Sequence, residues 1–361
     1  MEKAFITGAT GFIGKSLLKS LIENTEINSF ILLVRNKEKA KLNLSKLLIL
    51  ADYHEKNISM LEGDLTKQNL GISQADIDKL MDVQEVYHLA SNISLSNNEK
   101  YRDIVFDTNV EGTRNIIQLF INSNKVNNVY YFSSIFASGK SKEIIKEDWL
   151  QRPTKFRNHY EESKFLTEQM IKNYINNYNI PVTILRPSIV TASSKTDFSK
   201  VKNQTFYYFS RVLKKAIKLN NNSSIEIIGK PRSQSNIIQI DDLIMIVLEI
   251  RKLNEKKQIY NLINPSNIST SSFLESIREL LNFKYNIILR EDLNYNDLKE
   301  VEKFIYDRTE SYFEYNLEEN LLLDYNNIRN IAHKLNIKEI DNIWIKDHLR
   351  EFFSFLENER Q

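Results

Sequence analysis

Two side chains four residues apart, Tyr160 and Lys164, could act together on a carbonyl group. Positions i and i+4 share one face of a helix, so both side chains can point into one site. When a hydride is transferred to a carbonyl, charge develops on the oxygen and a proton donor must neutralise it. The phenol of tyrosine has a pKa of about 10, which a nearby ammonium lowers. The pair is therefore a candidate for proton transfer, with Lys164 lowering the pKa of Tyr160.

A serine pair precedes this tyrosine by one expected strand. Ser133 and Ser134 directly follow the apolar run Val129–Phe132. Active sites of open α/β sheets lie at the carboxyl ends of their strands. A hydroxyl there can donate a hydrogen bond to a substrate carbonyl, as a donor in an oxyanion hole does. The alternative is a strand-end serine whose hydroxyl bonds only to the backbone.

A glycine-rich loop lies near the start of the chain. The whole chain has 8 glycines, and three of them, Gly8, Gly11 and Gly14, fall between an apolar run and a helical pattern. Glycine permits a tight turn and lets the backbone approach a pyrophosphate, whose charge is favoured at a helix N-terminus. A turn without a ligand is the alternative. We expect a dinucleotide to contact one set of residues in this loop: Gly8, Thr10, Gly11, Phe12, Ile13 and Gly14.

The residue after the second apolar run favours NADP(H) as the dinucleotide. This residue is Arg35, at a place where an acidic side chain usually holds the 2′-OH of NAD. A guanidinium can instead form two parallel hydrogen bonds with a 2′-phosphate. NAD(H) stays the less favoured cofactor, and a solvated arginine at a strand end is the structural alternative.

These residues need a sheet that brings them together. Compact apolar runs alternate with helical patterns over the first 190 residues, which predicts an α/β fold with a doubly wound parallel sheet of the Rossmann type. Strands are expected at Ala4–Ile6, Phe30–Val34, Ile58–Leu61, Val86–Leu89, Val129–Phe132 and Val182–Leu185. Helices are expected at Phe12–Ile22, Lys37–Leu50, Gln74–Leu80, Asp103–Phe120 and Tyr160–Tyr178.

The pattern changes after Pro187. We expect residues 1–186 to form the NADP(H)-binding domain, with a returning segment at about 236–263, and residues 187–235 and 264–361 to form a smaller α+β or helical substrate cap. Further strands are expected at Ile237–Ile240 and Ile259–Ile263, and further helices at Lys202–Leu219, Thr270–Leu281, Asn327–Leu335 and Trp344–Leu356. The aromatic stripe of the first of these helices either lines an acyl tunnel or is ordinary core. Its basic side chains either meet phosphates or face water; they are Arg211, Lys214, Lys215 and Lys218.

The composition narrows the possible functions. With 49 basic and 47 acidic residues, the net charge of +2 gives no reason to invoke nucleic acid. The absence of cysteine excludes disulfides, thiolate zinc sites and a cysteine nucleophile. The 5 histidines show no metal-ligand spacing, so no metal is expected. We see no secretion signal and no apolar run of ~18–20 residues, so we expect a cytoplasmic protein without a transmembrane segment. The oligomeric state stays open, a homodimer included.

Taken together, the motifs resemble those of the extended short-chain dehydrogenases. The spacing from Gly8 to Gly14 is similar to the glycine motif of that family. Counting back from Gly139, Ser134 is similar to its catalytic serine or threonine. The resemblance implies that Ser134, Tyr160 and Lys164 are catalytic and that Lys164 also holds the cofactor ribose. It further implies support of the active site by Asn109, and cofactor contacts by Asp64, Leu65, Ala90, Ser91 and Pro187.

One branch of this family is more similar than the others. Residues 37–56, 63–73 and 185–190 resemble thioester reductases and fatty acyl-CoA reductases, the male-sterility-type branch. The resemblance covers about residues 3–190 and, more weakly, 236–242. It implies NADPH-dependent reduction of an acyl thioester to an aldehyde or alcohol. No carrier segment is attached, so the thioester would arrive as acyl-CoA or on a separate acyl-carrier protein.

Two alternatives to this function remain. One is another extended short-chain dehydrogenase: a nucleotide-sugar epimerase or dehydratase, or a ketone or hydroxysteroid-type reductase. Epimerases and dehydratases usually hold NAD, which Arg35 disfavours. The other is a non-catalytic NADP(H)-binding regulator. Such proteins often lose the tyrosine or the lysine, and both residues are present here.

Overall fold

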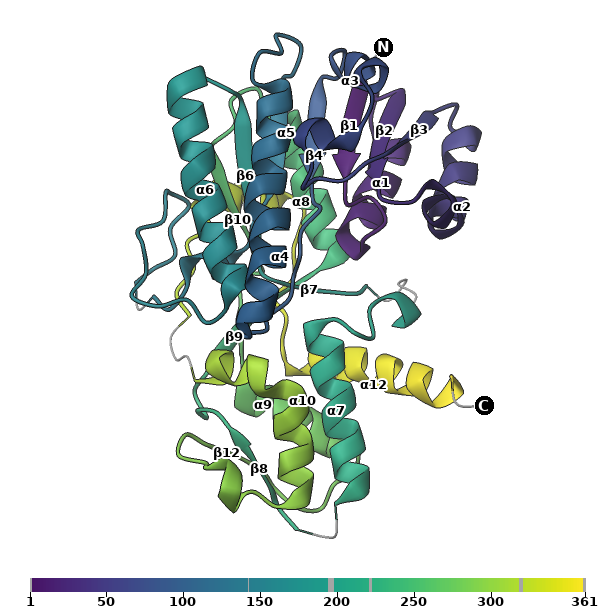
Figure 1. Cartoon of the computed structure of the whole chain (residues 1–361). Helices are drawn as coiled ribbons and strands as arrows, with labels where there is room; N and C mark the ends of the chain where they lie inside the picture. Colours follow the sequence, from purple (N-terminus) through teal and green to yellow (C-terminus); the bar gives the residue numbers. More distant parts are fainter. Residues whose placement is uncertain (1, 142, 194–197, 221–222, 318–320, 360–361) are drawn as a thin grey trace.

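The structure is a computed structural model and describes residues 2–141, 143–193, 198–220, 223–317 and 321–359. The larger part is a seven-stranded parallel sheet with helices on both faces, and the smaller part lies beyond the carboxyl ends of its strands (Figure 1). This arrangement confirms the predicted α/β fold of the Rossmann type.

All strands of the main sheet run parallel, in the spatial order β3-β2-β1-β4-β5-β6-β10. The order reverses direction at β1, as it does in doubly wound sheets, where the ligand lies at the reversal point. The strands are β1 (Lys3–Thr7), β2 (Ser29–Val34), β3 (Asn57–Glu62), β4 (Glu85–His88), β5 (Asn128–Phe132), β6 (Val182–Pro187) and the returning strand β10 (Ile259–Leu262).

Two hydrophobic clusters cover the two faces of this sheet. Every residue of β5 and β6 is buried, as expected for strands covered on both sides. One cluster contains side chains of α1 (Phe12–Asn24), α2 (Lys37–Tyr53), α8 (Ile240–Lys252) and α11 (Asn326–Lys334). The opposite cluster contains side chains of α3 (Gln74–Leu80), α5 (Gly112–Phe120) and α6 (His159–Tyr178). Both faces of the sheet are therefore packed against helices, and the edge at the carboxyl ends of the strands carries the predicted site residues.

The helix predicted over Asp103–Phe120 contains an irregular turn. It consists of α4 (Arg102–Phe106), a π-helical turn η3 (Asp107–Glu111) and α5, in unbroken succession. π-turns inside α-helices are frequent at functional sites. This one carries Asn109, one of the residues predicted to support the site.

The smaller part of the molecule has its own hydrophobic core. That core joins α7 (Thr205–Leu219), α9 (Thr270–Leu280), α10 (Glu300–Asn316) and α12 (Asn342–Asn358) with the two-stranded sheet of β8 (Ile225–Ile228) and β12 (Ile287–Arg290). A three-stranded sheet of β7 (Ile189–Thr191), β9 (Gln234–Gln239) and β11 (Asn267–Ser269) completes the strands. Short 3-10 turns lie at η1 (Gln68–Gly71), η2 (Glu99–Tyr101), η4 (Ile135–Ser138), η5 (Phe198–Lys200) and η6 (Tyr295–Asp297).

The structure differs from the predicted elements mainly after residue 187. Helix α10 and the strands β7, β8, β11 and β12 were not predicted. These strands have only three or four residues each, too few for a periodic pattern. Helix α11 was assigned to the cap, but Ile328 and Ile331 pack in the core of the main sheet. Among the described residues, no helix has the length and apolar character needed to cross a membrane.

A buried ion pair joins three segments near the carboxyl edge of the sheet. Arg186 on β6 donates to Glu168 on α6, from Nη2 at 2.6 Å and from Nε at 2.9 Å, and both side chains are fully buried. Ser133 Oγ donates to the same carboxylate at 2.6 Å. The guanidinium also donates to the carbonyls of Lys146 and Asp148. The pair thus ties β6, the end of β5 and the 146–148 segment to helix α6.

Removal of Glu168 should destabilise the protein strongly. A Glu168→Ala variant leaves Arg186 as an uncompensated buried cation, and breaking such a pair costs about 3–5 kcal/mol in the free energy of unfolding. The matched control is Glu162→Ala on the same helix, whose carboxylate lies 3.9 Å from the exposed Arg152. Because exposed pairs contribute about 0–1 kcal/mol, the control should unfold close to wild type in urea. Equal unfolding midpoints for the two variants would contradict this assignment.

Candidate active site

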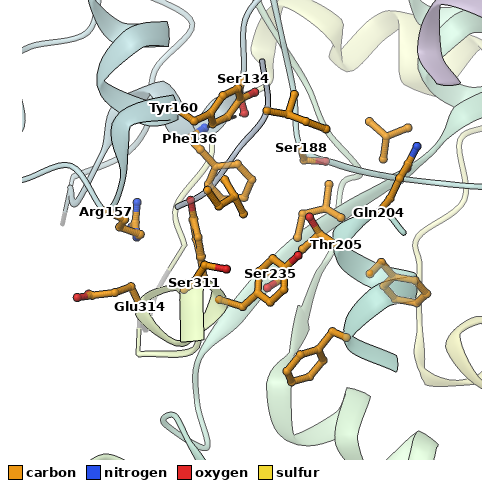
Figure 2. Close-up of a pocket in the computed structure, with 18 of the residues that line it drawn as sticks. Ser134, Phe136, Arg157, Tyr160, Ser188, Gln204, Thr205, Ser235, Ser311 and Glu314 are labelled. Atoms are coloured by element: carbon orange, nitrogen blue, oxygen red, sulfur yellow. Dashed lines mark hydrogen bonds between the residues drawn. The ribbon is translucent and has the colours of Figure 1, made fainter. Parts of the chain in front are cut away.

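The carboxyl edge of the main sheet and the smaller domain enclose one large cavity. Its volume is about 1260 Å³. From the main sheet, the predicted site residues that line it are Gly8, Gly11, Phe12, Ile13, Gly14, Ser91, Ser134, Tyr160, Lys164 and Pro187. The smaller domain contributes residues of α7, α9 and α10 (Figure 2). The structure thus brings the glycine loop and the proposed catalytic set to one cavity.

The glycine loop forms a tight turn between β1 and α1. Gly8 has φ +77°, and the Gly11 N–H donates to the Gly8 carbonyl at 2.9 Å. A Cβ added to Gly14 would lie 2.1 Å from the Gly8 oxygen. Gly11 is the N-cap of α1, and no acidic residue lies in the first helical turn. No side chain caps the start of α1, so the loop can present the free backbone N–H groups of this helix end to an anion.

Tyr160 and Ser134 meet at the cavity wall. Tyr160 lies in the first turn of α6, whose N-cap Asn158 accepts from the Glu161 N–H at 3.0 Å. Ser134 follows β5, and its Oγ accepts from the Phe136 N–H at 3.2 Å. The two hydroxyls are hydrogen-bonded to each other, and Figure 2 shows them side by side. A carbonyl oxygen placed beside them would face two hydroxyl groups.

Lys164 is almost completely buried below the tyrosine. Its Nζ donates to the Phe132 carbonyl at 2.8 Å and lies 5.9 Å from the centre of the Tyr160 ring. Burial lowers the pKa of Lys164 to about 7. The expected lowering of the Tyr160 pKa by this lysine is not found in the described structure. Burial instead raises the pKa of Tyr160 to about 12, and the hydrogen bond from Ser134 opposes that rise. Desolvation disfavours the phenolate, and Lys164, which is itself desolvated, is not among the groups that lower this pKa.

Asn109 holds the segment after β4 against helix α6. Its Oδ1 accepts from the Asn92 N–H at 2.7 Å and from Ser91 Oγ at 2.9 Å. Its Nδ2 donates to the Asn92 carbonyl and to Ser163 Oγ, which in turn donates to the Tyr160 carbonyl. Because the amide already makes four hydrogen bonds, its position suits support of the site better than contact with a substrate.

The remaining predicted cofactor residues lie outside the cavity lining, along the same edge of the sheet. Arg35 follows β2 and is exposed, and Asp64 and Leu65 follow β3. Hydrogen bonds from Thr66 lower the pKa of Asp64. Ala90 lies shortly after β4, and its N–H donates to Thr7 Oγ1 at 3.2 Å. Thr10 is exposed in the glycine loop. Their contacts with a cofactor stay predictions.

Helix α10 supplies site residues that the sequence did not reveal. Tyr315 accepts from Asn158 Nδ2 at 2.9 Å, and the Arg157 guanidinium lies 4.9 Å from the centre of its ring. Arg157 is itself paired with Glu161 in a buried ion pair of 2.9 Å. These residues flank Tyr160 and fix the start of α6 to the smaller domain. Helical spacing of apolar residues over 304–313 could have indicated α10, whereas nothing local links Tyr315 to α6.

The aromatic and basic side chains of α7 lie in different surroundings. Phe206 and Phe209 of the predicted aromatic stripe line the cavity, whereas Tyr207 is buried in the core and hydrogen-bonds to His348. Lys214, expected either to meet phosphates or to face water, is buried and donates to Glu357 at 2.8 Å, so both alternatives are wrong for this residue. Among the described residues, no group of acidic or histidine side chains is arranged to hold a metal.

Several known proteins resemble this chain. The fatty acyl-CoA reductase wat of Drosophila melanogaster is 28% identical over 222 residues, which cover 52% of this chain and 42% of that protein. The chain spans less than half the length of the curated relatives it matches. The terminal R domain from the myxalamid PKS-NRPS biosynthetic pathway has a TM-score of 0.75 at 20% identity, covering 99% of this chain and 91% of that one.

Two other solved structures share the fold. A thiolation-reductase di-domain from an archaeal non-ribosomal peptide synthetase has a TM-score of 0.72 at 19% identity, covering 99% of this chain and 76% of that one. UDP-glucuronic acid 4-epimerase from Bacillus cereus has a TM-score of 0.67 at 17% identity, with 99% of each chain covered. At these identities the similarity concerns the fold alone.

A family model places the chain more closely. The NAD-binding domain model described as "Male sterility protein" matches residues 6–244, which include the glycine loop, the proposed catalytic set and β6. The chain therefore belongs to the Male sterility protein family, and it is an NAD(P)-dependent oxidoreductase of the extended short-chain dehydrogenase type.

Proposed function

We propose that this protein uses NADPH to reduce an acyl thioester to an aldehyde. The observation that carries the proposal is the cavity itself. Tyr160, Ser134 and Lys164 lie on one of its walls, the glycine loop forms a second, and aromatic side chains form a third. Fatty acyl-CoA reductase and thiolation-reductase relatives support an acyl thioester as the substrate class.

The residues present fit a dinucleotide. A Cβ added to Gly14 would lie 2.1 Å from the Gly8 oxygen, and one added to Gly8 would lie 2.6 Å from the Ala90 nitrogen, so the turn requires glycine at both positions. The N-terminus of α1 would hold the pyrophosphate, Lys164 the ribose hydroxyls and Arg35 the 2′-phosphate. Asp64 would lie near the adenine. When bound, the cofactor supplies a hydride to the acyl carbon.

The protein's own groups would then serve the substrate oxygen. Ser134 would donate a hydrogen bond to the carbonyl, and Tyr160 would donate the proton. Because burial raises the pKa of Tyr160 to about 12, the phenol stays protonated at neutral pH, as a proton donor must be. Lys164, held by the Phe132 carbonyl, would fix the ribose below the tyrosine.

The smaller domain supports an apolar acyl group. Phe206 and Phe209 on α7, Phe273 on α9 and Tyr312 on α10 line the same cavity. The rings of Phe206 and Phe273 lie 5.3 Å apart, and those of Phe209 and Phe273 lie 6.0 Å apart. We propose that this aromatic wall receives the acyl chain, delivered as acyl-CoA or on an acyl-carrier protein.

A thioester panel tests the proposed reaction. NADPH oxidation should depend on added acyl-CoA or acyl-carrier protein, and the product analysis separates aldehyde from alcohol. Tyr160→Phe should reduce turnover by about 10²–10⁴-fold, because the general acid is lost, while NADPH binding stays near wild type. A folded preparation that binds NADPH but ignores a broad range of thioesters would exclude this function, and full activity of Tyr160→Phe would exclude the catalytic assignment.

The choice of cofactor can be tested at Arg35. An Arg35→Ala variant should raise the KM for NADPH by about 10–100-fold, since a bidentate charged contact with the 2′-phosphate is lost. The KM for NADH, which has no such phosphate, should change little. The matched control is Lys41→Ala, which removes another exposed cation, on α2, and should leave the KM for both cofactors near wild type. Equal effects of Arg35→Ala on both cofactors would show that the arginine does not read the phosphate.

The pH dependence of cofactor capture should report Lys164. Its pKa is lowered to about 7, so the ammonium is present below that pH and is lost as the pH rises through it. We therefore expect kcat/KM for NADPH, which reports the free enzyme, to fall above about pH 7. Lys164→Arg should be less active overall but should lack this decline, because a guanidinium stays charged. A wild-type profile that is flat to pH 9 would contradict the role.

A further inference from the structure

Ser188 is a buried hydroxyl at the cavity that the proposed mechanism does not use. It follows β6 directly, and its side chain is among the cavity-lining residues. The residue is only 6% exposed, and its Oγ has no hydrogen-bond partner among the described residues. Leaving a buried hydroxyl unsatisfied costs free energy, so such groups in native structures call for an explanation. Its backbone N–H, by contrast, donates to the Leu262 carbonyl at 3.1 Å.

The position of Ser188 follows from the sheet. Strands β5 and β6 are parallel neighbours in which Phe132 pairs with Leu185. Ser134 and Ser188 come two and three residues after these partners, so both leave the sheet at the same edge. Figure 2 shows the Ser188 hydroxyl between the Ser134–Tyr160 pair and Gln204–Thr205 of the smaller domain. Serine has a single side-chain torsion, so one χ1 step suffices to redirect its hydroxyl within the cavity.

The opposite side of this space is the N-terminus of α7. This helix has 15 residues, begins at Thr205, and receives no side-chain cap from its N-cap residue Gln204. The first N–H groups of a helix carry a partial positive charge and favour an anion. A thiolate is stabilised at such a place, as the lowered pKa of cysteines at helix N-termini shows. The unpartnered hydroxyl and the helix end thus line the same cavity as Ser134 and Tyr160, at a place where negative charge would be favoured.

We propose that Ser188, assisted by the N-terminus of α7, stabilises the thiolate that leaves during thioester reduction. The inference rests on the proposed function. Once the hydride has reached the acyl carbon and Tyr160 has protonated the oxygen, the substrate is a hemithioacetal. Its collapse returns the hydroxyl proton to the Tyr160 phenolate, re-forms the C=O bond and breaks the C–S bond. The electron pair of the C–S bond leaves on sulfur as a thiolate, which accepts a hydrogen bond from Ser188 and then takes a proton from solvent.

This step separates a thioester from a ketone. Ketone reduction ends when the oxygen is protonated, so Ser134 and Tyr160 are sufficient for it. A thioester also expels sulfur as a thiolate, and a hydrogen bond to the departing sulfur stabilises the charge that develops there, as a lower thiol pKa would. Ser188, the hydroxyl in addition to those of Ser134 and Tyr160, therefore has a role in the reduction of a thioester that it would not have in the reduction of a ketone.

Single-turnover kinetics with octanoyl-CoA test the proposal. Loss of NADPH absorbance measures hydride transfer, and a disulfide reagent measures released CoA. The chain has no cysteine, so every thiol detected comes from the substrate. In wild type the two signals should coincide. In Ser188→Ala, NADPH loss should stay within about twofold of wild type, while CoA release should lag by about 10–100-fold, the range for a lost hydrogen bond to a charged group.

Variants and a second substrate complete the test. Ser188→Thr keeps the hydroxyl and should restore CoA release, and Ser235→Ala, on β9 at the same cavity, should behave as wild type. With an octanoyl aryl thioester, whose thiolate leaves readily, the lag of Ser188→Ala should nearly vanish. Coincident signals in Ser188→Ala, or slowed NADPH loss with weakened NADPH binding, would overturn the proposal and, in the second case, assign the hydroxyl to the cofactor. Absence of NADPH oxidation by wild type with every thioester would instead refute the proposed function on which this inference rests.

Discussion

The buried ion pair of Arg186 and Glu168 is the interaction on which the geometry of the cavity depends. Arg186 lies two residues before Ser188, Glu168 lies one helical turn after Lys164, and Ser133, which donates to the carboxylate, precedes Ser134. Each segment that bears a proposed reactive group is thus anchored within a few residues of that group. Burying two charges is favourable only when their hydrogen bonds are satisfied, and the carbonyls of the 146–148 segment meet that condition. These bonds tie β5, β6 and α6 to one another at the edge of the cavity.

Desolvation sets the protonation states inside this frame. The same burial that raises the pKa of Tyr160 to about 12 lowers that of Lys164 to about 7, because it disfavours the charged form of each group. The tyrosine is thereby kept as a phenol, the form that gives a proton. The lysine is placed by its hydrogen bond to the Phe132 carbonyl. For a reductase, a buried neutral acid beside a second hydroxyl is a useful starting state.

The smaller domain completes the cavity rather than merely covering it. Its helices α7, α9 and α10 contribute the aromatic wall, and Tyr315 of α10 contacts the start of α6 through Asn158 and Arg157. The proposed acyl-binding wall and the helix that carries Tyr160 are therefore joined by direct contacts. Differences in α7 and α10 would be expected to change the preferred acyl group while leaving the cofactor edge intact, since the latter is built entirely from β1–β6 and their helices.

Local sequence determined the cofactor half of this protein. Compact apolar runs identified the strands of the main sheet, and three glycines at a spacing of three marked the expected phosphate turn. The i,i+4 spacing placed Tyr160 and Lys164 on one helix face. Those signals are readable because each depends on residues close together in the chain. Tertiary structure alone decided the rest. The Arg186–Glu168 pair joins residues 18 positions apart, and the contact of Tyr315 with Asn158 joins residues 157 positions apart. Ser188 and the start of α7 line one cavity from different parts of the fold. The shifts in pKa likewise depend on burial, which arises only when distant segments pack together and exclude water.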